Sequence, residues 1–329
     1  MEQRVCVIGG ATWDAFFTTA QADLVKASAG RGQPALAFPY GGKVDAQEVL
    51  YGFGGGAANV AVGLTHLGVR ADVLTRVGRD WRGSEVAKNF RHVGVGTRLL
   101  QYDRSTKTAL AFIVTAGRGH DHVAFVARGA TVNLHVPPRL PGRYQWCYVS
   151  ALATPDWSVK LRRLFGNFTR QGGSIFWNPG AGQLAEPKKL AALLRYVTVL
   201  DLNSDEARLL LRRLKRGSFR NVPAMLKALK ALGPKLVLVT CGHEGAYLYD
   251  GTHCMYHEVY QVKPVNTTGA GDAFGSGWLA GYLASGMNLN VAMQWGMLNS
   301  NSVITQVGAQ RGLLTMSTLA KFRAFYDRA

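Results

Sequence analysis

A glycine-rich loop that ends in an acid is the segment best suited to chemistry. NTTGAGD (266–272) places Gly269, Ala270 and Gly271 directly before a helical pattern. Small residues at a helix start leave backbone N–H groups free to bind an anion. Asp272, in the first turn, is expected to stay ionised in the helix dipole and could accept a proton from an attacking hydroxyl. Anion site and base together suffice for phosphoryl transfer, although a tight turn with a capping acid has the same pattern.

Two other glycine clusters have the spacing of nucleotide-binding motifs without their context. GFGGGA (52–57) has GxGxxA spacing, and Asp72 follows twenty residues later as in a dinucleotide fingerprint. Asp72 opens its predicted strand instead of closing it, so it would lie at the wrong edge of a sheet. GRDWRGS (78–84) has P-loop spacing but lacks the phosphate-binding lysine. Neither cluster predicts a phosphate cradle.

The elements that must position these loops alternate between short apolar runs and segments of helical period. This alternation predicts an α/β fold with a mainly parallel sheet. The expected strands are 4–10, 71–78, 146–150, 174–178, 197–201, 235–240 and 246–250. The expected helices are 57–67, 84–93, 157–171, 204–215, 222–232, 270–285 and 290–306.

Two regions interrupt this alternation and predict extended β insertions, approximately 15–53 and 97–133. The second region contains the strand-like runs LAFIVTA and HVAFVAR around the turn GRGHD. Together the insertions predict a small β-sheet lid over the carboxyl edge of the main sheet, where open α/β folds bind ligands. Exposed apolar strands in such a lid favour a homodimer. The residues expected at its interface are Phe112, Val114, Val123 and Phe125.

Composition indicates a globular chain with an excess of positive charge. The 329 residues are 47% hydrophobic, and 38 basic against 20 acidic residues give a net charge of +18. A denser basic run through 208–220 alternates with leucines, which predicts an amphipathic helix. Basic and aromatic residues do not interleave, and no zinc-finger spacing occurs, so the sequence predicts against a nucleic-acid partner.

The apolar runs are too short to cross a bilayer, and no charged leader precedes a long apolar run. We therefore expect a soluble, cytoplasmic protein that does not associate with membranes. Four cysteines lie far apart and never as CxxC. This spacing favours buried reduced thiols over a zinc site or disulfides.

Five segments, in order, resemble the ribokinase-like (PfkB) family. GGGAANVAVGLTHLGVRADVLTRVG (54–78) and NTTGAGDAF (266–274) resemble its two signatures. LDLNSDEARLL (200–210) is similar to its NxxE motif, VTCGHEGAYLYD (239–250) to its TxGxxG strand pair, and VITQVGA (303–309) to its closing nucleotide loop. Order and separation fit over nearly the whole chain. The resemblance implies one kinase domain over 1–329, a Rossmann-like three-layer αβα sandwich with a small β-sheet lid, and ATP as phosphoryl donor.

The resemblance also assigns substrate contacts. Asp14, expected at the end of the first strand, would hydrogen-bond substrate hydroxyls. Gly55 and Gly56 would let the substrate approach the backbone, and Asn59 would add a polar contact or be an ordinary first-turn residue. Asn178 either contacts the phosphates or forms an Asx turn.

The nucleotide side follows in the same way. Asn203 and Glu206 would orient water around Mg²⁺ and the phosphates, or would only cap their helix. The expected nucleotide wall consists of Thr240, Gly242 and Gly245, and Asn299 would line the base pocket.

Two departures from the family pattern bear on specificity. Asn266 stands where the family commonly has Asp at a monovalent-cation position, so K⁺ dependence stays open even though the carbonyls of Thr268 and Gly308 could still coordinate an ion. Gly56 stands where ribokinases carry Lys, and nothing else singles out ribose.

The resemblance thus implies transfer of the ATP γ-phosphoryl group to a hydroxyl of a sugar or nucleoside, with Asp272 as general base. One alternative is a phosphorylated sugar as acceptor, which Asn178, Arg104, Lys107 and Arg128 would contact. Another is a non-catalytic ligand-binding protein of the same fold, although such a protein need not keep both Asp272 and its glycines.

Overall fold

The main sheet has eight strands, in a computed structural model that describes residues 3–26, 34–116, 122–217, 219 and 221–326. Its strand order is β16-β15-β14-β13-β12-β11-β1-β6. Six strands are parallel: β1 (Arg4–Ile8), β6 (Arg70–Leu74), β11 (Trp146–Val149), β12 (Ser174–Trp177), β13 (Val199–Asn203) and β14 (Leu236–Thr240). Two antiparallel strands, β15 (Ala246–Tyr249) and β16 (Cys254–His257), complete one edge.

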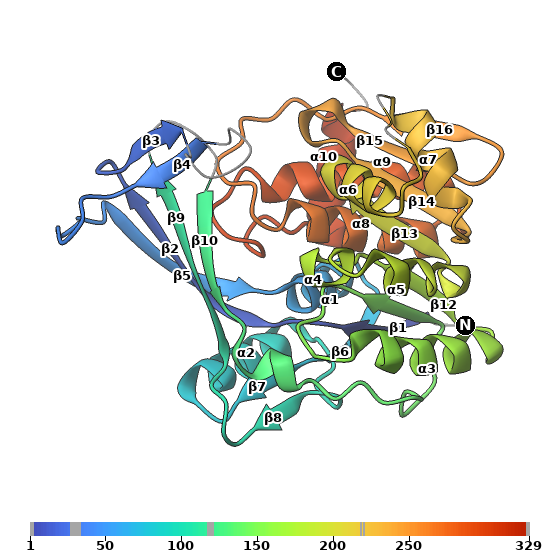
Figure 1. The fold of residues 1–329 in the computed structure, drawn as a ribbon, viewed down its shortest axis with the longest axis horizontal. Helices are drawn as coiled ribbons and strands as arrows, with labels where there is room; N and C mark the ends of the chain where they lie inside the picture. The colour runs from blue at the N-terminus through green and yellow to red at the C-terminus, as the bar shows by residue number, and fades with distance from the viewer. Residues whose placement is uncertain (1–2, 27–33, 117–121, 218, 220, 327–329) are drawn as a thin grey trace.

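Helices cover both faces of this sheet and complete a three-layer sandwich (Figure 1). One face packs on α1 (Gly56–His66), α2 (Trp81–Val93), α8 (Ala270–Ala284), α9 (Leu289–Val303) and α10 (Met316–Tyr326). The other packs on α3 (Trp157–Arg170), α4 (Ala181–Leu184), α5 (Pro187–Ala191), α6 (Ser204–Arg213) and α7 (Val222–Lys230). Val5 and Val7 enter the first core, whereas Cys6 and Ile8 enter the second. This alternation follows from the two-residue period of a strand and confirms the predicted fold class.

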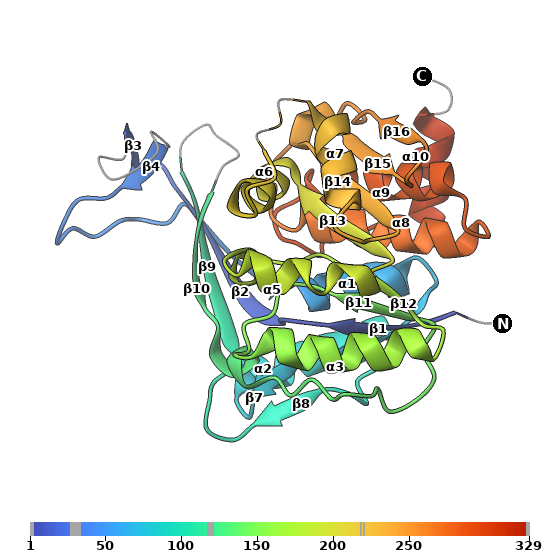
Figure 2. The same cartoon turned by 45° about the vertical axis from the view of Figure 1, so that its right-hand side comes forward.

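A smaller four-stranded sheet stands at one end of this body (Figure 2). Its order is β10 (His122–Ala127), β9 (Ala109–Ala116), β2 (Thr12–Thr19) and β5 (Glu48–Gly54). Two short pairs accompany it, β3 (Asp23–Lys26) with β4 (Pro34–Ala37) and β7 (Arg76–Gly78) with β8 (Gln101–Asp103). The predicted turn GRGHD lies at 117–121, outside the described residues. Asp14 lies within β2, so the sequence-based placement at the end of the first strand is wrong.

The two faces of the small sheet differ in exposure. Phe16, Ala111 and Ile113 are buried on the inner face. On the outer face, the register aligns Tyr51, Ala15, Phe112 and Phe125 in one row across all four strands. The three aromatic side chains of this row are 58%, 42% and 56% exposed, respectively. The small sheet therefore presents an apolar outer face.

Other sequence predictions can be checked directly. On α6, Leu210 and Leu211 are buried while Arg208 and Arg212 are exposed, which confirms the amphipathic helix. All four cysteines are free, but Cys254 is exposed because it lies on the edge strand β16, so predicted burial is wrong for that residue. Among the described helices, none combines the length and apolarity needed to span a membrane.

Candidate active site

The starts of two helices meet at the carboxyl end of β11. A methyl group at Gly56 would lie 2.9 Å from the Ser150 hydroxyl oxygen and 3.2 Å from Asp272 Oδ1. Gly55 caps α1 with φ of 89°, and a methyl group there would lie 2.6 Å from the Gly10 carbonyl oxygen. Both the positive φ and the close approach require glycine at position 55. The glycine run therefore lets α1 begin against the acid of α8.

Asp272 lies half-buried in the first turn of α8, behind the N-cap Gly269 with φ of 83°. Its Oδ2 accepts a hydrogen bond of 2.8 Å from Asn59 Nδ2. Burial raises the pKa of Asp272, and the Asn59 hydrogen bond opposes that shift only in part. The sequence predicted an acid held ionised by the helix dipole, whereas burial acts in the opposite direction. A raised pKa suits a general base, because proton transfer is most efficient near the working pH.

A chain of side-chain amides runs from α2 to this carboxylate. Asn89 Nδ2 donates to Gln310 Oε1 at 3.1 Å, and Gln310 Nε2 donates to Asn59 Oδ1 at 3.0 Å. Because Gln310 occupies the Asn59 oxygen, the Asn59 amide must present its N–H to Asp272. Each amide thus fixes the orientation of the next, and Gln310 and Asn89 act as positioning residues for the acid.

Gln310→Ala is expected to lower kcat by about tenfold, a loss of about 1.4 kcal/mol that is typical for a hydrogen bond serving a charged group. Without the Gln310 donor the Asn59 amide can rotate, and the pKa of Asp272 should rise further. The acidic limb of the kcat against pH profile should therefore move to higher pH. Steady-state kinetics of the purified protein between pH 5 and 9 would measure both effects.

Two further variants separate positioning from packing. Gln310→Glu keeps the side-chain size but replaces the donor with an acceptor, so it should be impaired at least as strongly as Gln310→Ala. Gln306→Ala, at an exposed position four residues earlier, should leave the profile unchanged. If the acidic limb of the kcat against pH profile stays in place in both Gln310 variants, the chain of amides does not position Asp272.

Asp14 is the second acid of the site and is only 4% exposed. Thr12 Oγ1 donates to its Oδ1 at 2.5 Å, and burial raises its pKa to about 6. A methyl group at Gly54 would lie 1.9 Å from Asp14 Oδ2, so this carboxylate packs against the backbone of the glycine run. Above about pH 6 Asp14 is an ionised acceptor, suited to hydroxyl groups that donate to it.

Three polar residues lie in one row across neighbouring parallel strands, two just after β11 and β12 and one within β13. The register pairs Val149 with Trp177 and Trp177 with Leu200, so Ser150, Asn178 and Asp201 come next on their strands. Asn178 Nδ2 donates to the Asp201 carbonyl at 3.0 Å, with Asp201 Oδ2 at 3.4 Å.

One of the two interpretations of Asn178, the Asx turn, is excluded by a backbone contact. The Gly180 N–H donates to Gln183 Oε1, so no Asx turn forms at Asn178. Asp201 is buried, and burial raises its pKa well above the usual range, with Glu206 and Asp272 adding to the shift. The row therefore supplies polar groups at the carboxyl edge of the main sheet, the edge at which Asp272 lies.

Asn203 and Glu206 form a capping box at the start of α6. Asn203 Oδ1 accepts from the backbone of Asp205 and Glu206, and Glu206 Oε2 accepts from the backbone of Asn203 at 3.0 Å. Burial raises the pKa of Glu206. The cap leaves Asn203 Nδ2 and Glu206 Oε1 as the side-chain atoms that could serve a metal-bound water or a phosphate.

The predicted nucleotide wall divides into open and packed positions. Thr240 ends β14 half-buried, and Gly242 has open space where a side chain would stand. A methyl group at Gly245 would lie 2.3 Å from the His257 carbonyl oxygen, so this glycine serves strand packing. Asn299 is fully buried, donates to the Ala273 carbonyl and accepts from the Leu314 N–H. It joins α9 to α8 and does not reach a nucleotide surface, which corrects the predicted base-pocket role.

The predicted cation loop packs against the segment that carries Gly308. Asn266 is buried, its Oδ1 accepts from the Thr268 N–H at 3.0 Å, and its own N–H donates to the Ile304 carbonyl. A methyl group at Gly269 would lie 2.6 Å from the Ala309 side chain. The fold thus brings the segments of Asn266, Thr268 and Gly308 together.

Sequence reasoning missed Ser150, Asp201, Asn89 and Gln310. Ser150 and Asp201 carry a weak signal, because each is a polar residue at the end of an apolar strand-like run. Asn89 and Gln310 carry none, since their contact joins positions 221 residues apart.

A helix start that can bind anions lies beside a half-buried acid at the carboxyl edge of an α/β sheet, an arrangement suited to phosphoryl transfer. Residues 19–316 match the pfkB family of carbohydrate kinases. The chain belongs to this family and is a carbohydrate or nucleoside kinase. It is 23% identical to a ribokinase of Staphylococcus aureus (strain COL) over 95% of this chain and 97% of the relative. It is 27% identical to a nucleoside kinase of Methanothermobacter thermautotrophicus over 79% of this chain and 81% of the relative.

Solved structures share the fold. The nucleoside kinase of Methanocaldococcus jannaschii aligns with a TM-score of 0.78 at 20% identity, covering 98% of both chains. The Arabidopsis thaliana ribokinase complexed with ribose and ATP aligns with a TM-score of 0.79 at 18% identity, covering 98% of this chain and 99% of that one. The Burkholderia thailandensis nucleoside kinase in complex with inosine aligns with a TM-score of 0.79 at 18% identity, covering 99% of both.

Proposed function

We propose that this protein transfers the γ-phosphoryl group of ATP to a hydroxyl of a sugar or nucleoside, with Asp272 as general base. The observation that carries the proposal is the position of Asp272, in the first turn of α8 and hydrogen-bonded to Asn59. Gly271 beside it is exposed, with open space around its Cα. A phosphoryl group can therefore approach the backbone N–H groups of α8 while the acid receives the hydroxyl proton.

In this mechanism Asp14 accepts hydrogen bonds from neighbouring substrate hydroxyls and fixes the acceptor next to Asp272. Asp272 takes the proton as the acceptor oxygen attacks the γ-phosphorus, and the bond between the γ-phosphorus and the bridging oxygen breaks so that ADP leaves. The N–H groups at the start of α8 stabilise charge on the transferring oxygens. Mg²⁺ would neutralise the ATP phosphates, with Glu206 Oε1 positioned to orient a water bound to it. Thr240 and Gly242 offer an open surface to the nucleotide.

An acceptor screen tests the proposal directly. Purified protein with Mg²⁺ and ATP would be incubated with ribose, fructose, adenosine and inosine, and with the phosphorylated sugar fructose 6-phosphate, while ADP and phosphorylated product are measured. Turnover of one acceptor at kcat above about 1 s⁻¹ would match ordinary enzymes. Saturable binding of a sugar or nucleoside without product would instead favour a non-catalytic binding protein of this fold.

The cation loop yields a prediction about monovalent ions. Asn266 supplies a neutral amide oxygen, so we expect kcat in KCl to exceed kcat in tetramethylammonium chloride by less than about twofold. Asn266→Asp places a negative charge at this position. Its attraction for an ion at contact distance in a hydrated site is worth about 1 kcal/mol, so the ratio of kcat in KCl to kcat in tetramethylammonium chloride should rise to about fivefold.

Asn290→Asp, an exposed change on α9, is the matched control and should behave like the wild type. Strong K⁺ activation of the wild type, or a ratio unaltered by Asn266→Asp, would count against this account of the loop.

We also propose that the outer face of the small sheet pairs with a second copy of the chain. A row of exposed aromatic side chains at Tyr51, Phe112 and Phe125 is an apolar surface that pairing would remove from water. Light scattering should give twice the 35.6 kDa of one chain. Phe112→Asp should give the monomer mass, whereas Val159→Asp on α3 should not; a wild-type monomer at micromolar concentration would refute the pairing.

A further inference from the structure

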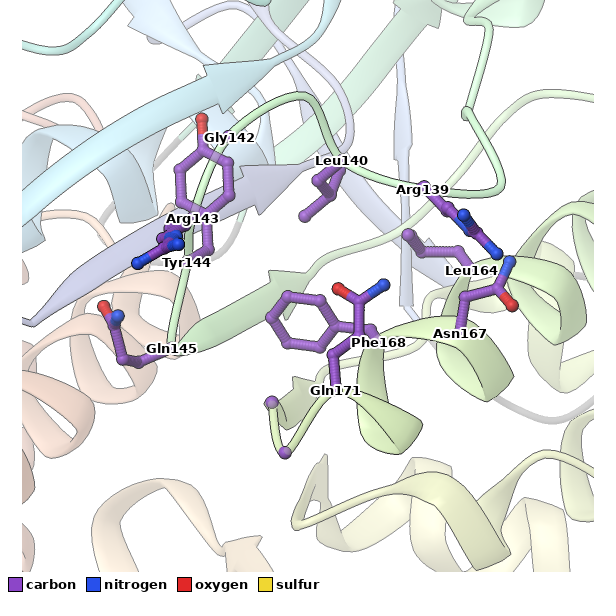
Figure 3. Close-up of a pocket in the computed structure, with 12 residues that line it drawn as sticks. Arg139, Leu140, Gly142, Arg143, Tyr144, Gln145, Leu164, Asn167, Phe168 and Gln171 are labelled. Carbon is purple, nitrogen blue, oxygen red and sulfur yellow. The ribbon is translucent and has the colours of Figure 1, made fainter.

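Two adjoining cavities open at the end of the sheet opposite the active site. The first, of about 340 Å³, is lined in part by Arg139, Arg143 and Asn167 (Figure 3). The second, of about 470 Å³, is lined in part by Arg162, Arg163 and Arg170, and shares Asn167 with the first. Gln145 and Gly173 of the first cavity precede β11 and β12, whereas the polar row of the active site follows these strands. We call this pair of cavities the arginine surface.

The arginine surface concentrates much of the excess charge of the chain. Residues 129–200 contain nine basic residues and only two acids, Asp156 and Glu186. Neither acid lines the cavities, and Glu186 is paired with Lys189 and Trp157. In the described part of the chain, no ion pair joins the five arginines to a carboxylate. Their charge is therefore available to an external anion.

Helix α3 explains how the arginines are gathered. It buries its apolar side chains, among them Leu161, Leu164 and Phe168, and leaves the opposite face to solvent. On that face Arg163 and Arg170 lie seven residues apart, two turns along the same side. The loop before β11 adds Arg139 and Arg143 beside them. The sequence hides this cluster, because its members come from two separate segments.

Part of the surface is already ordered for an anion. Arg170 Nε donates to the Gly166 carbonyl at 2.9 Å, and its Nη2 donates to Asn167 Oδ1 at 2.6 Å. Asn167 Nδ2 in turn donates to the Pro138 carbonyl at 2.8 Å, at the boundary of the two cavities. These bonds fix the guanidinium plane while leaving further N–H groups of Arg170 for a ligand. Less side-chain entropy is then lost on binding.

We propose that the arginine surface binds nucleic acid through its phosphates and independently of sequence. Five guanidinium groups over two cavities exceed what one phosphate needs, but they match a backbone of repeated phosphates. Arg195 covers one face of the Tyr196 ring at 4.9 Å. Tyr144 is buried, with Arg98 over its ring at 5.1 Å, so the surface offers little aromatic area for base stacking. Contacts to phosphate without base contacts give affinity without sequence preference.

Fluorescence anisotropy with a labelled single-stranded RNA 20-mer tests this proposal between 50 and 300 mM NaCl. Saturating ATP and Mg²⁺ would be present so that the active site is occupied. With about five phosphates contacted, log K against log salt should be linear with a slope of about −3.5. Arg162→Ala/Arg163→Ala should make that slope shallower by about 1.4. Arg162→Lys/Arg163→Lys should restore it.

The matched control is Arg212→Ala/Arg216→Ala, which removes the same charge from an exposed face of α6 and the residues after it. It should keep the wild-type slope, and both double variants should keep wild-type kinase activity. Equal loss of RNA affinity in the two double variants would show that net charge alone attracts RNA and would overturn the proposal. RNA binding that appears only when ATP is left out, or equal competition by poly-glutamate, would also overturn it.

Discussion

Asp272→Asn is expected to lower kcat by about 10²- to 10⁴-fold, the range that general-base catalysis contributes. The amide keeps the size of the carboxylate and can still pair with Asn59, so the fold and the start of α8 should persist. The KM for ATP should change by less than about twofold, because this mechanism gives Asp272 no role in holding the nucleotide. Steady-state kinetics with the best acceptor would measure both parameters.

The pH profile gives this prediction a second readout. The folded-state pKa of Asp272 is raised by burial, so the base is protonated, and kcat is lost, as pH falls through a value above the usual range for aspartate. Residual activity of Asp272→Asn should lack this acidic limb. Asp205→Asn, at a side chain that is 94% exposed, is the matched control and should keep it. If Asp272→Asn is as fast as the wild type, Asp272 is not the general base.

The elements of the main sheet were predictable because their signals are local. The predicted strand 146–150 and helix 157–171 match β11 and α3 within one residue. Strand β16 was missed because it is a four-residue edge strand whose burial alternates between exposed and partly buried. Asp14 was misplaced because it was assigned to the end of the first strand, whereas Gly9, with φ of 152°, separates β1 from the small sheet, where Asp14 lies in β2.

The residues of the site were predictable only where they lie together in one segment of the sequence. The loop before Asp272 combines the helix start, the small residues and the acid in seven positions. Ser150 and Asp201 reach the site because β11 and β13 lie on either side of β12, and strand order is not encoded locally. Asn299 was mispredicted because a polar residue on a helix gives no sign that Ala273 and Leu314 occupy its amide.

Gly56→Ala is expected to lower kcat by about 10²-fold. The added methyl group would lie 2.9 Å from Ser150 Cβ and Oγ and 3.2 Å from Asp272 Oδ1, so the start of α1 or the acid must move. A displacement of about 1 Å in a reacting group can cost this much in rate. Overpacking should also cost about 1–3 kcal/mol of unfolding free energy. Initial rates and urea unfolding would measure the two effects separately.

The cause of that loss can be isolated by a second substitution. Ser150→Gly removes two of the three close contacts, so the Gly56→Ala/Ser150→Gly enzyme should recover at least about tenfold of the lost rate. Gly166→Ala is the matched control, because a methyl group there meets nothing within 4 Å, and it should keep wild-type kcat. Recovery would show that position 56 requires glycine in this chain because Ser150 packs closely against it. No recovery, with stability restored, would instead mean that the methyl group itself blocks the approach of the substrate to the backbone at position 56.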